Sequence, residues 1–416
     1  MVGKGFCNVL PEFQRARSSV ILVIIVICLI GNCKVLVGND EELVRLRRQS
    51  GQIVTSIELD QVVALGQVDT GCSSLVIHST GLDRRVANLR TSTKPILRFG
   101  TNTLETYYQD FPVRMFGGQR RLVNVMLADR SSLETAFGVP KDALIGMACI
   151  RSLKLRINVR DAIFAPQAEG TDEKENVVQL EWSSISCPIV SVRLPVLGMQ
   201  SVMLDTGYDG WLSLSTNRIE QLVRAKQATF LEERPMWTPS GVITIKVYVV
   251  RHIDFAGKRF HNVPVTSSHV ETIGLGLLQH FDMTLDFPNS RASFVPLDIP
   301  RDQMPLDASG LRVVFRESDR LIIRRIVPDS PAEKAVFKEG DRVLDFAGRE
   351  PAKLWRHEIQ ETLAKAGETI HLKIERDGRP LEIDLPLSRP YQYPPEWPPE
   401  PPEFNPDAVP ESSGRN

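Results

Sequence analysis

The sequence predicts a mainly β protein, in which two duplicated β-rich lobes are followed by a small α+β domain. The first observation is a pair of Asp-Thr-Gly tripeptides, Asp69-Thr70-Gly71 and Asp205-Thr206-Gly207, each set between apolar, strand-like runs. The second is a set of short alternating segments, such as Ile243-Thr244-Ile245-Lys246-Val247, separated by glycine turns. The third is a change of pattern near residue 309, where strand-like and helix-like segments mix.

The duplication extends beyond the tripeptides. In both halves an apolar-apolar-Gly motif precedes an Asn or Asp by 12 residues, from Gly146 to Asn158 and from Gly274 to Asp286. Internal repeats of this kind identify an architecture before any single motif does. Two more segment pairs correspond in the same order, namely 118–125 with 257–263 and 56–59 with 191–194. We therefore expect each half to be one copy of the same folded unit.

Composition excludes several classes of function. The chain has 416 residues, 42% of them hydrophobic, which is enough for two or three domains with full cores. A net charge of −1 at pH 7 gives no electrostatic reason for a nucleic-acid partner. The six cysteines do not make a disulfide framework, and no C-x-x-C or H-E-x-x-H motif occurs. We therefore predict neither a metal nor another cofactor.

Residues 1–38 are expected to be a signal peptide or a membrane anchor. Arg15 and Arg17 precede an uninterrupted apolar run from Val20 to Ile30. A basic region followed by an apolar core of this length is typical of a secretory signal, because a full span needs about 20 residues. No A-x-A cleavage site follows, so an uncleaved anchor that tethers the chain to a membrane is the alternative. In either case we expect the body of the protein to be exported, extracytoplasmic or secreted.

The two lobes are expected at residues 50–162 and 177–298, joined by a polar linker at 163–176. Glycines at Gly117-Gly118 and at Ala256-Gly257 are hairpin signals, one in each lobe. A helix is expected after Ser215-Thr216, with Ile219, Leu222 and Val223 on one face.

Residues 309–388 are expected to form the third unit. Leu321 to Val327 reads as a strand, and Ser330-Pro331-Ala332-Glu333 has the N-cap, first-turn proline and glutamate of a capping box. A second helix is marked by Trp355, Ile359 and Leu363, and Asp377-Gly378 is typical of a tight hairpin turn. This order resembles a bacterial-type PDZ domain, which implies a C-terminal peptide as its ligand. The tail, residues 389–416, is rich in proline and is expected to be extended or disordered.

The paired tripeptides allow a specific chemistry. Two adjacent carboxyl groups share one proton at moderate pH, because both cannot ionise side by side. The ionised member can take a proton from water while the protonated member polarises a carbonyl group, and the titration belongs to the pair. Gly71 and Gly207 let the two loops approach closely, and the hydroxyl groups of Thr70 and Thr206 can hydrogen-bond across the pair.

These motifs resemble clan AA aspartic proteases, the pepsin and retropepsin type. The resemblance covers roughly residues 50–298 and is stronger in the second half, around Asp205 to Leu212 and Ile273 to Leu278. It implies a bilobal acid-protease fold and an aspartic-type endopeptidase, in which Asp69 and Asp205 activate water against a peptide or protein substrate. Thr70, Gly71, Thr206 and Gly207 would then be supporting loop residues, Gly146 and Gly274 would pack behind them, and a β-hairpin flap would cover the substrate.

The chain departs from this pattern directly after each tripeptide. Members of the family usually carry Ser, Thr or Ala there, whereas this chain has Cys72 and Tyr208. Asn158 also replaces an acidic residue found at Asp286 in the second half. Cys72 and Tyr208 leave both carboxyl groups in place, but they put in question how the chemical properties of the carboxyl pair are tuned.

Three other functions are compatible with parts of this sequence. One is a non-catalytic peptide-binding protein with a decayed cleft, and another is a membrane-tethered scaffold that recruits partners through the PDZ unit and the tail. The third, a Cys72 nucleophile with His78, lacks an orienting partner. Gly274-Leu275-Gly276 lacks the third glycine of a dinucleotide loop, and His357-Glu358 lacks a second histidine for zinc.

Overall fold

The structure is a computed structural model of the 416-residue chain. It describes residues 51–59, 62–78, 97–99, 102–104, 107–116, 118, 120–128, 143–167, 176–238, 241–299, 306–316, 320–388 and 397. The expected signal or anchor segment, and all of the tail except Trp397, lie outside these residues. No helix within the described ranges combines the length and the apolar character that a membrane span requires.

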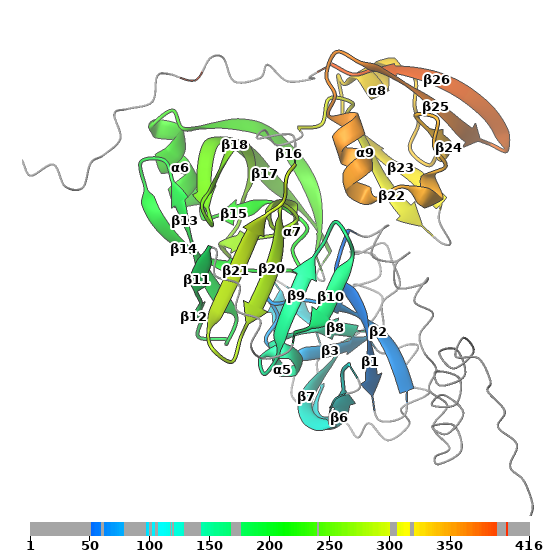
Figure 1. The fold of residues 1–416 in the computed structure, drawn as a ribbon. Coiled ribbons are helices and arrows are strands. Elements are labelled where there is room, and N and C mark those ends of the chain that lie inside the picture. The colour runs from blue at the N-terminus through cyan, green and yellow to red at the C-terminus, as the bar shows by residue number, and fades with distance from the viewer. Residues whose placement is uncertain are drawn as a thin grey trace, which may run out of the picture. The chain divides into compact units, whose positions relative to one another are not determined.

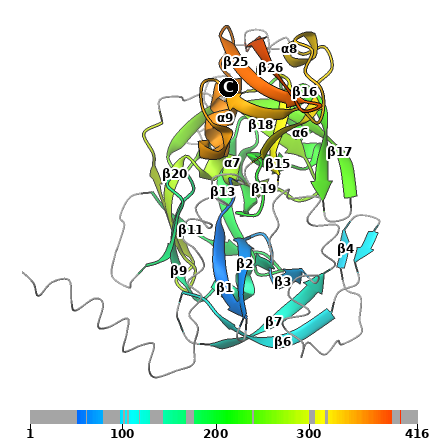
Figure 2. The same cartoon turned by 90° about the vertical axis from the view of Figure 1, so that its right-hand side faces the viewer.

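The first repeat forms a closed barrel in the strand order β1-β2-β8-β3-β7-β6. Figure 2 labels β1, β2, β3, β6 and β7 of this barrel. Within it, β2 and β8 run parallel, so that Val68 at the end of β2 lies opposite Ile145. Two further short strands pair as a separate ribbon. The bounds are β1 (Val54–Leu59), β2 (Val62–Val68), β3 (Leu75–His78), β4 (Leu97–Phe99), β5 (Asn102–Leu104), β6 (Tyr107–Arg114), β7 (Arg121–Ala128) and β8 (Ala143–Ile145).

The second repeat contributes an eight-stranded sheet in the order β12-β13-β14-β19-β15-β18-β17-β16. Here β14 and β19 run parallel and place Leu204 opposite Ile273, which is the counterpart of the β2–β8 pair. The bounds are β12 (Glu181–Trp182), β13 (Pro188–Leu194), β14 (Gly198–Leu204), β15 (Leu212–Leu214), β16 (Ala228–Thr238), β17 (Gly241–Phe255), β18 (Lys258–Ser267) and β19 (Thr272–Ile273).

The helix and the hairpin turns expected in this region are confirmed. α6 (Thr216–Arg224) follows β15 and buries Ile219 and Leu222. Val223, which the sequence pattern predicts on the same face, is instead exposed. Ala256-Gly257 joins β17 to β18, and the turn ending at Gly118 joins β6 to β7.

A third sheet unites strands of both repeats, in the order β10-β9-β20-β21-β11 (Figure 1). β9 of the first repeat pairs antiparallel with β20 of the second, and Arg156 reaches across this seam to the carboxylate of Asp282. β10 occupies the start of the segment that we expected to be a linker. The bounds are β9 (Lys154–Asn158), β10 (Ile163–Pro166), β11 (Val177–Gln179), β20 (Phe281–Asp286) and β21 (Arg291–Pro296).

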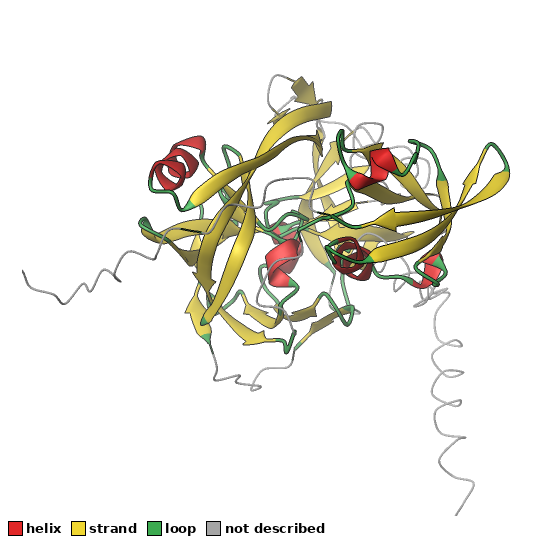
Figure 3. Ribbon diagram, turned by 90° about the horizontal axis from the view of Figure 1, so that it is seen from above, coloured by secondary structure: helices red, strands yellow, loops and turns green. Residues whose placement is uncertain are grey.

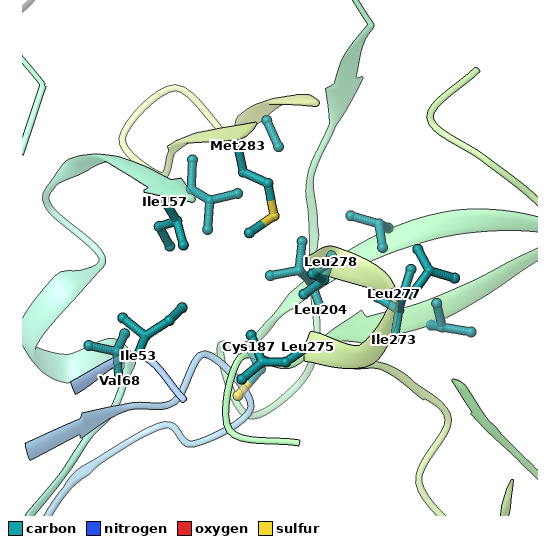
Figure 4. Close-up of a cluster of buried hydrophobic side chains, with 14 of the residues drawn as sticks. Ile53, Val68, Ile157, Cys187, Leu204, Ile273, Leu275, Leu277, Leu278 and Met283 are labelled. Atoms are coloured by element: carbon teal, nitrogen blue, oxygen red, sulfur yellow. The ribbon is translucent and has the colours of Figure 1, made fainter. Parts of the chain in front are cut away.

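One continuous apolar core runs through both repeats. Figure 4 shows its centre, where Val68 and Leu204, the residues that precede the two aspartates, lie on different sides of the same cluster. Leu275 and Leu278 of α7 (Leu275–Leu278) pack beside Leu204. The carboxyl loops therefore rest on a buried support, which limits their movement.

The C-terminal unit has its own core and a five-stranded sheet in the order β22-β23-β24-β25-β26. Asp377 and Gly378 have φ values of 52° and 75°, as a type I′ hairpin turn requires. Ser330 caps α8 as expected, but the Glu333 carboxylate accepts from Asp329 N–H. The bounds are β22 (Leu311–Arg316), β23 (Arg320–Ile326), α8 (Pro331–Lys334), β24 (Arg342–Phe346), η1 (Pro351–Lys353), α9 (Arg356–Leu363), β25 (Thr369–Arg376) and β26 (Arg379–Pro386).

Strands make up most of the described chain, and the helices between them are short (Figure 3). The expectation of a mainly β protein is therefore confirmed.

Candidate functional site

Asp69 and Asp205 occupy equivalent positions at the ends of the two parallel strand pairs. Asp69 N–H donates to Ile145 C=O at 3.0 Å, and Asp205 N–H donates to Ile273 C=O at the same distance. Each aspartate is thus fixed by the last hydrogen bond of its strand pair. The frame that the sequence repeats is repeated in the structure.

A short buried helix supports each loop from behind. α5 (Met147–Ile150) begins after Gly146, and its first N–H donates to Cys72 C=O at 2.8 Å. α7 begins after Gly274 and makes the same bond to Tyr208 C=O, also at 2.8 Å. The side-chain difference between Cys72 and Tyr208 therefore leaves the backbone course of the two loops unchanged.

Thr70 and Thr206 tie the two loops together as the sequence predicts. Thr70 N–H donates to Thr206 Oγ1 at 3.1 Å, and Thr206 N–H donates to Thr70 Oγ1 at 3.0 Å. The two hydroxyl groups in turn donate to Leu204 C=O and Val68 C=O, at 2.6 and 2.9 Å. Both threonines are fully buried, so these four bonds form a closed, satisfied network.

The two glycines bring each carboxyl group onto the opposite loop. A Cβ atom at Gly207 would lie 2.5 Å from Asp69 Oδ1, and one at Gly71 would lie 2.6 Å from Asp205 Oδ2. Real side chains do not tolerate such contacts, so neither position accepts a larger residue without displacing a carboxyl group. This close approach is what brings Asp69 and Asp205 together.

The surroundings of the pair keep a proton on it. Burial raises the pKa of Asp69 well above its ordinary value, and so do the neighbouring charge of Asp205 and the side-chain hydrogen bond with Asp205. Burial also raises the pKa of Asp205, but hydrogen bonds from Gly207 N–H, from Asp69 and from Tyr208 N–H oppose that shift. The Gly207 and Tyr208 bonds reach Asp205 Oδ1 at 2.8 and 3.1 Å. The pair therefore retains a proton at pH values where an isolated carboxyl group would be ionised, and that proton belongs to the pair.

Both carboxyl residues keep some contact with solvent, since each is only half-buried. A ligand can thus reach one hydrogen-bond donor and one negative acceptor on the proton-sharing pair. This arrangement can bind an amide group and exchange a proton with it.

Two thiol groups lie close enough to feel the charge of the pair. Burial first, and then Asp69, raises the pKa of Cys72 far above its ordinary value. Burial likewise raises the pKa of Cys187, to about 12. Since the thiolate is the reactive form, neither cysteine is a nucleophile at moderate pH. The side chain of His78, the partner weighed for Cys72, lies outside the described side chains.

Sequence reasoning missed one polar residue of the site. Gln67 is completely buried two residues before Asp69, and its Nε2 atom donates to Gly207 C=O at 3.2 Å. A polar side chain inside an apolar strand run was the available signal. In the described part of the chain, no three His, Cys, Asp or Glu side chains are grouped to hold a metal ion.

The C-terminal unit contacts the loop that carries Asp205. Arg356, the first residue of α9, donates to the carboxylate of Asp209 at 2.8 Å, and both side chains are partly exposed. Glu361 of the same helix pairs with Arg160 of the first repeat, and Arg312 of β22 pairs with Glu232 of β16. Partly exposed ion pairs of this kind contribute little to stability.

Residues 300–387 match the PDZ domain family. The C-terminal unit is therefore a PDZ domain, as its sequence predicts, and PDZ domains bind peptide segments of other proteins. Among curated proteins, the chain is similar to a probable periplasmic serine endoprotease, DegP-like, of Marinomonas sp. (strain MWYL1). The two are 39% identical over 70 residues, which are 17% of this chain and 15% of the relative.

This comparison contradicts the protease type expected from the sequence. The named relative is a serine endoprotease with no stated aspartic chemistry, so the expectations of an aspartic-type endopeptidase and of a pepsin-like or retropepsin-like enzyme are wrong. The similarity to a protease and the assignment of the PDZ domain are unaffected by this correction. The error arose because motif and fold resemblance was used to assign a reaction, which a fold alone does not determine.

Proposed function

We propose that this chain is an exported peptide-binding protein that acts in proteolysis. Its PDZ domain captures peptide segments, and Asp69 and Asp205 form the functional centre of the adjoining β unit. Thr70, Gly71, Thr206 and Gly207 support that centre. The pair is proposed as a site that binds an amide group and exchanges a proton with it, and not as the centre of an aspartic-type endopeptidase.

The single observation that carries the site is the meeting of the two carboxyl groups. Each lies against the glycine of the opposite loop, and the four threonine bonds hold the loops in register. Fully satisfied buried polar networks rigidify the groups that they hold, and a rigidly placed carboxyl pair with raised pKa values fits a functional site. A proton-sharing pair presents one donor and one acceptor, which matches the C=O and N–H groups of a peptide backbone.

For the fold, we propose a bilobal arrangement of the acid-protease type, with lobes at 50–162 and 177–298. The matched strand pairs β2–β8 and β14–β19 support it, as do the equivalent helices α5 and α7. The proposal concerns architecture alone, since one fold hosts many functions.

One similarity supports a role in proteolysis, and two independent features support export. The chain covers 15% of the length of a relative that is described as a periplasmic serine endoprotease. The basic residues and apolar run before residue 38 point to export as well. Tethering by an uncleaved anchor remains a proposal of the same kind, tested by sequencing the mature N-terminus.

The test uses peptide libraries with the full chain and with Asp69→Asn and Asp205→Asn. We expect wild-type protein to bind extended peptides, and each variant to bind them about 10-fold or more weakly, since hydrogen bonds to charged groups contribute about 1.5–3 kcal/mol. Asp209→Asn, which changes an exposed carboxylate on the same loop, is the matched control. Unchanged peptide affinity in both variants would overturn the role of the pair.

A fluorophosphonate reagent tests the role in proteolysis, because it labels activated serine hydroxyl groups. Peptide cleavage that disappears after labelling supports serine-type proteolysis by this chain. If the full chain cleaves no peptide and promotes no cleavage by a co-purified protease, the role in proteolysis is wrong.

A further inference from the structure

The loop that leads into β22 of the PDZ domain directs its backbone N–H groups at a carboxylate of its own. Asp307 Oδ1 accepts from Ser309 N–H at 2.9 Å and from Ser309 Oγ at 2.6 Å, and Asp307 Oδ2 accepts from Gly310 N–H at 3.1 Å. The next N–H group, that of Leu311, donates to Ser309 Oγ at 2.9 Å. Three successive N–H groups at the start of β22 are thus satisfied within the loop.

Backbone bonds to both helices of the domain hold this loop in place. Ala308 N–H donates to Leu363 C=O at the end of α9 at 2.8 Å, and Ser309 C=O accepts from Ala332 N–H in α8 at 2.9 Å. Gly310 has a φ of 76°, and a Cβ atom there would lie 2.1 Å from the N-cap side chain of α8. Successive N–H groups beside a left-handed residue form a concave binding place for an anion. Asp307 is the anion that occupies it.

The charges around the loop disfavour a second carboxylate. Arg312 donates to Asp307 Oδ2 and also to both carboxylate oxygens of Glu232, at 3.0 and 3.2 Å. One guanidinium group between two carboxylates leaves a net negative charge at this end of β22. The carboxylate of a ligand would therefore meet N–H groups that are already bonded and a repulsive charge.

β22 is the outer strand of this sheet that is better suited to accept an added strand. β22 and β26 end the strand order, and within the described ranges no further strand pairs with either. β26 contains Pro380, Pro386, Glu382 and Asp384, and proline and charge are what natural sheets use to block edge pairing. β22 has no proline and carries the apolar run 313–315. Since PDZ domains bind an extended peptide along a sheet edge, we assign the ligand to β22.

We propose that this PDZ domain binds an internal, extended segment of a partner protein along β22, and that Asp307 excludes a free C-terminal carboxylate from the loop before that strand. The inference rests on the proposed capture of peptides and names the kind of peptide. It departs from the sequence resemblance, which implies a C-terminal peptide. The main-chain bonds of an added strand need no chain end, whereas a terminal carboxylate would have to displace Asp307 from four donors.

A purely local role for Asp307, as a cap of the turn before β22, predicts something different. Removing a local cap lowers stability and leaves the class of ligand unchanged. Removing an excluding group also frees the loop N–H groups and the guanidinium group of Arg312 for the carboxylate of a ligand. The two roles therefore differ in ligand preference and not in stability.

The experiment measures binding of short apolar peptides to the full chain, each peptide made with a free C-terminal carboxylate and with a C-terminal amide. We expect the wild-type chain to bind both forms equally. Asp307→Ala should bind the free-acid form about 10-fold more tightly, because hydrogen bonds to a charged group are the stronger ones. Asp384→Ala removes an exposed carboxylate from β26 of the same domain and, as the matched control, should behave as wild type.

Backbone amide NMR of the full chain locates the contacts independently of peptide affinity. Acetate should shift the amide signals of Ser309 and Gly310 in Asp307→Ala and leave them unchanged in the wild-type chain. The amidated peptides should shift amide signals of β22 and not those of β26.

A wild-type chain that prefers the free-acid peptides by about 10-fold would overturn the proposal, and so would peptide-induced shifts in β26 alone. An Asp307→Ala variant that loses stability but gains neither acetate binding nor a preference for the free acid would show that Asp307 is only a local cap. If that variant does not fold, the wild-type comparison decides. Failure of the wild-type chain to bind either peptide form would contradict the proposed capture of peptides itself, and the acetate experiment would still show whether Asp307 fills an anion site.

Discussion

Thr70 and Thr206 are joined reciprocally: each hydroxyl group accepts the backbone N–H of the other residue, at 3.1 and 3.0 Å. The two residues are 136 positions apart in the chain. These two reciprocal hydrogen bonds connect the two repeats at the point where the carboxyl groups meet.

Thr206→Val should therefore destabilise both repeats at once. The change conserves volume but leaves Thr70 N–H and Val68 C=O without their buried partner, and each unsatisfied group costs about 1–3 kcal/mol. We expect a loss of about 2–5 kcal/mol in the free energy of unfolding, measured by denaturant titration. Thr206→Ser keeps the hydroxyl group and should cost far less. A Val variant as stable as the Ser variant would contradict the network.

Gly207→Ala should separate the carboxyl pair. The added methyl group would overlap the Asp69 carboxyl group, and such overpacking costs about 1–3 kcal/mol. We expect lower stability together with a lower pKa of Asp69, because Asp205 would no longer lie beside it. Ser73→Ala, on the exposed part of the first loop, is the control in the same titration. Retention of the raised pKa in Gly207→Ala would refute the packing.

The raised pKa of Asp69 predicts the sign of a stability change with pH. The folded protein holds a proton on Asp69 at pH values where the unfolded chain, with a pKa of about 3.9, has released it. Folding therefore takes up a proton, and this contribution to stability falls as pH rises from about 4 through the raised pKa. Asp69→Asn should show a smaller decline, which then belongs to Asp205, whose pKa burial also raises. Calorimetric melting across this range checks it, and parallel curves for the two proteins would show that Asp69 titrates normally.

Asp341 should be essential to the stability of the PDZ domain. Its carboxylate is almost fully buried, and it accepts from Arg376 Nε at 2.8 Å and from Lys338 N–H, also at 2.8 Å. Asp341→Asn leaves the positive charge of Arg376 without its carboxylate partner. Breaking a buried ion pair costs about 3–5 kcal/mol. Because Arg376 keeps some solvent contact, we expect about 2–4 kcal/mol, measured by denaturation of the full chain. Asp377→Asn, on the exposed turn, should be nearly neutral.

Much of this architecture could be predicted because both repeats carry the same local signals. The glycine hairpins, the helix after Ser215 and the meeting of the two Asp-Thr-Gly loops follow from turn chemistry and from matched apolar frames. Val223 was misplaced because helical spacing alone cannot say how wide the covered face is.

Other features depend on contacts between distant residues, which one sequence does not reveal. The hydrogen bond between the hydroxyl groups of Tyr208 and Thr266 joins residues 58 positions apart, and only packing shows that Gly210 and Gly274 make room for the Tyr208 ring. The protease type was wrong for a different reason, since motifs establish which groups meet but not which reaction they serve.

The sheet that unites β9 and β10 with β20, β21 and β11 has a consequence for how this chain folds. β9 ends at Asn158, and its neighbour β20 starts at Phe281, so the first repeat keeps an open strand edge until much of the second has been synthesised. An uncovered edge can recruit strands from other chains. A factor that shields β9 during synthesis would prevent this aggregation, and ribosome-bound chains ending before residue 281 should be the most prone to it.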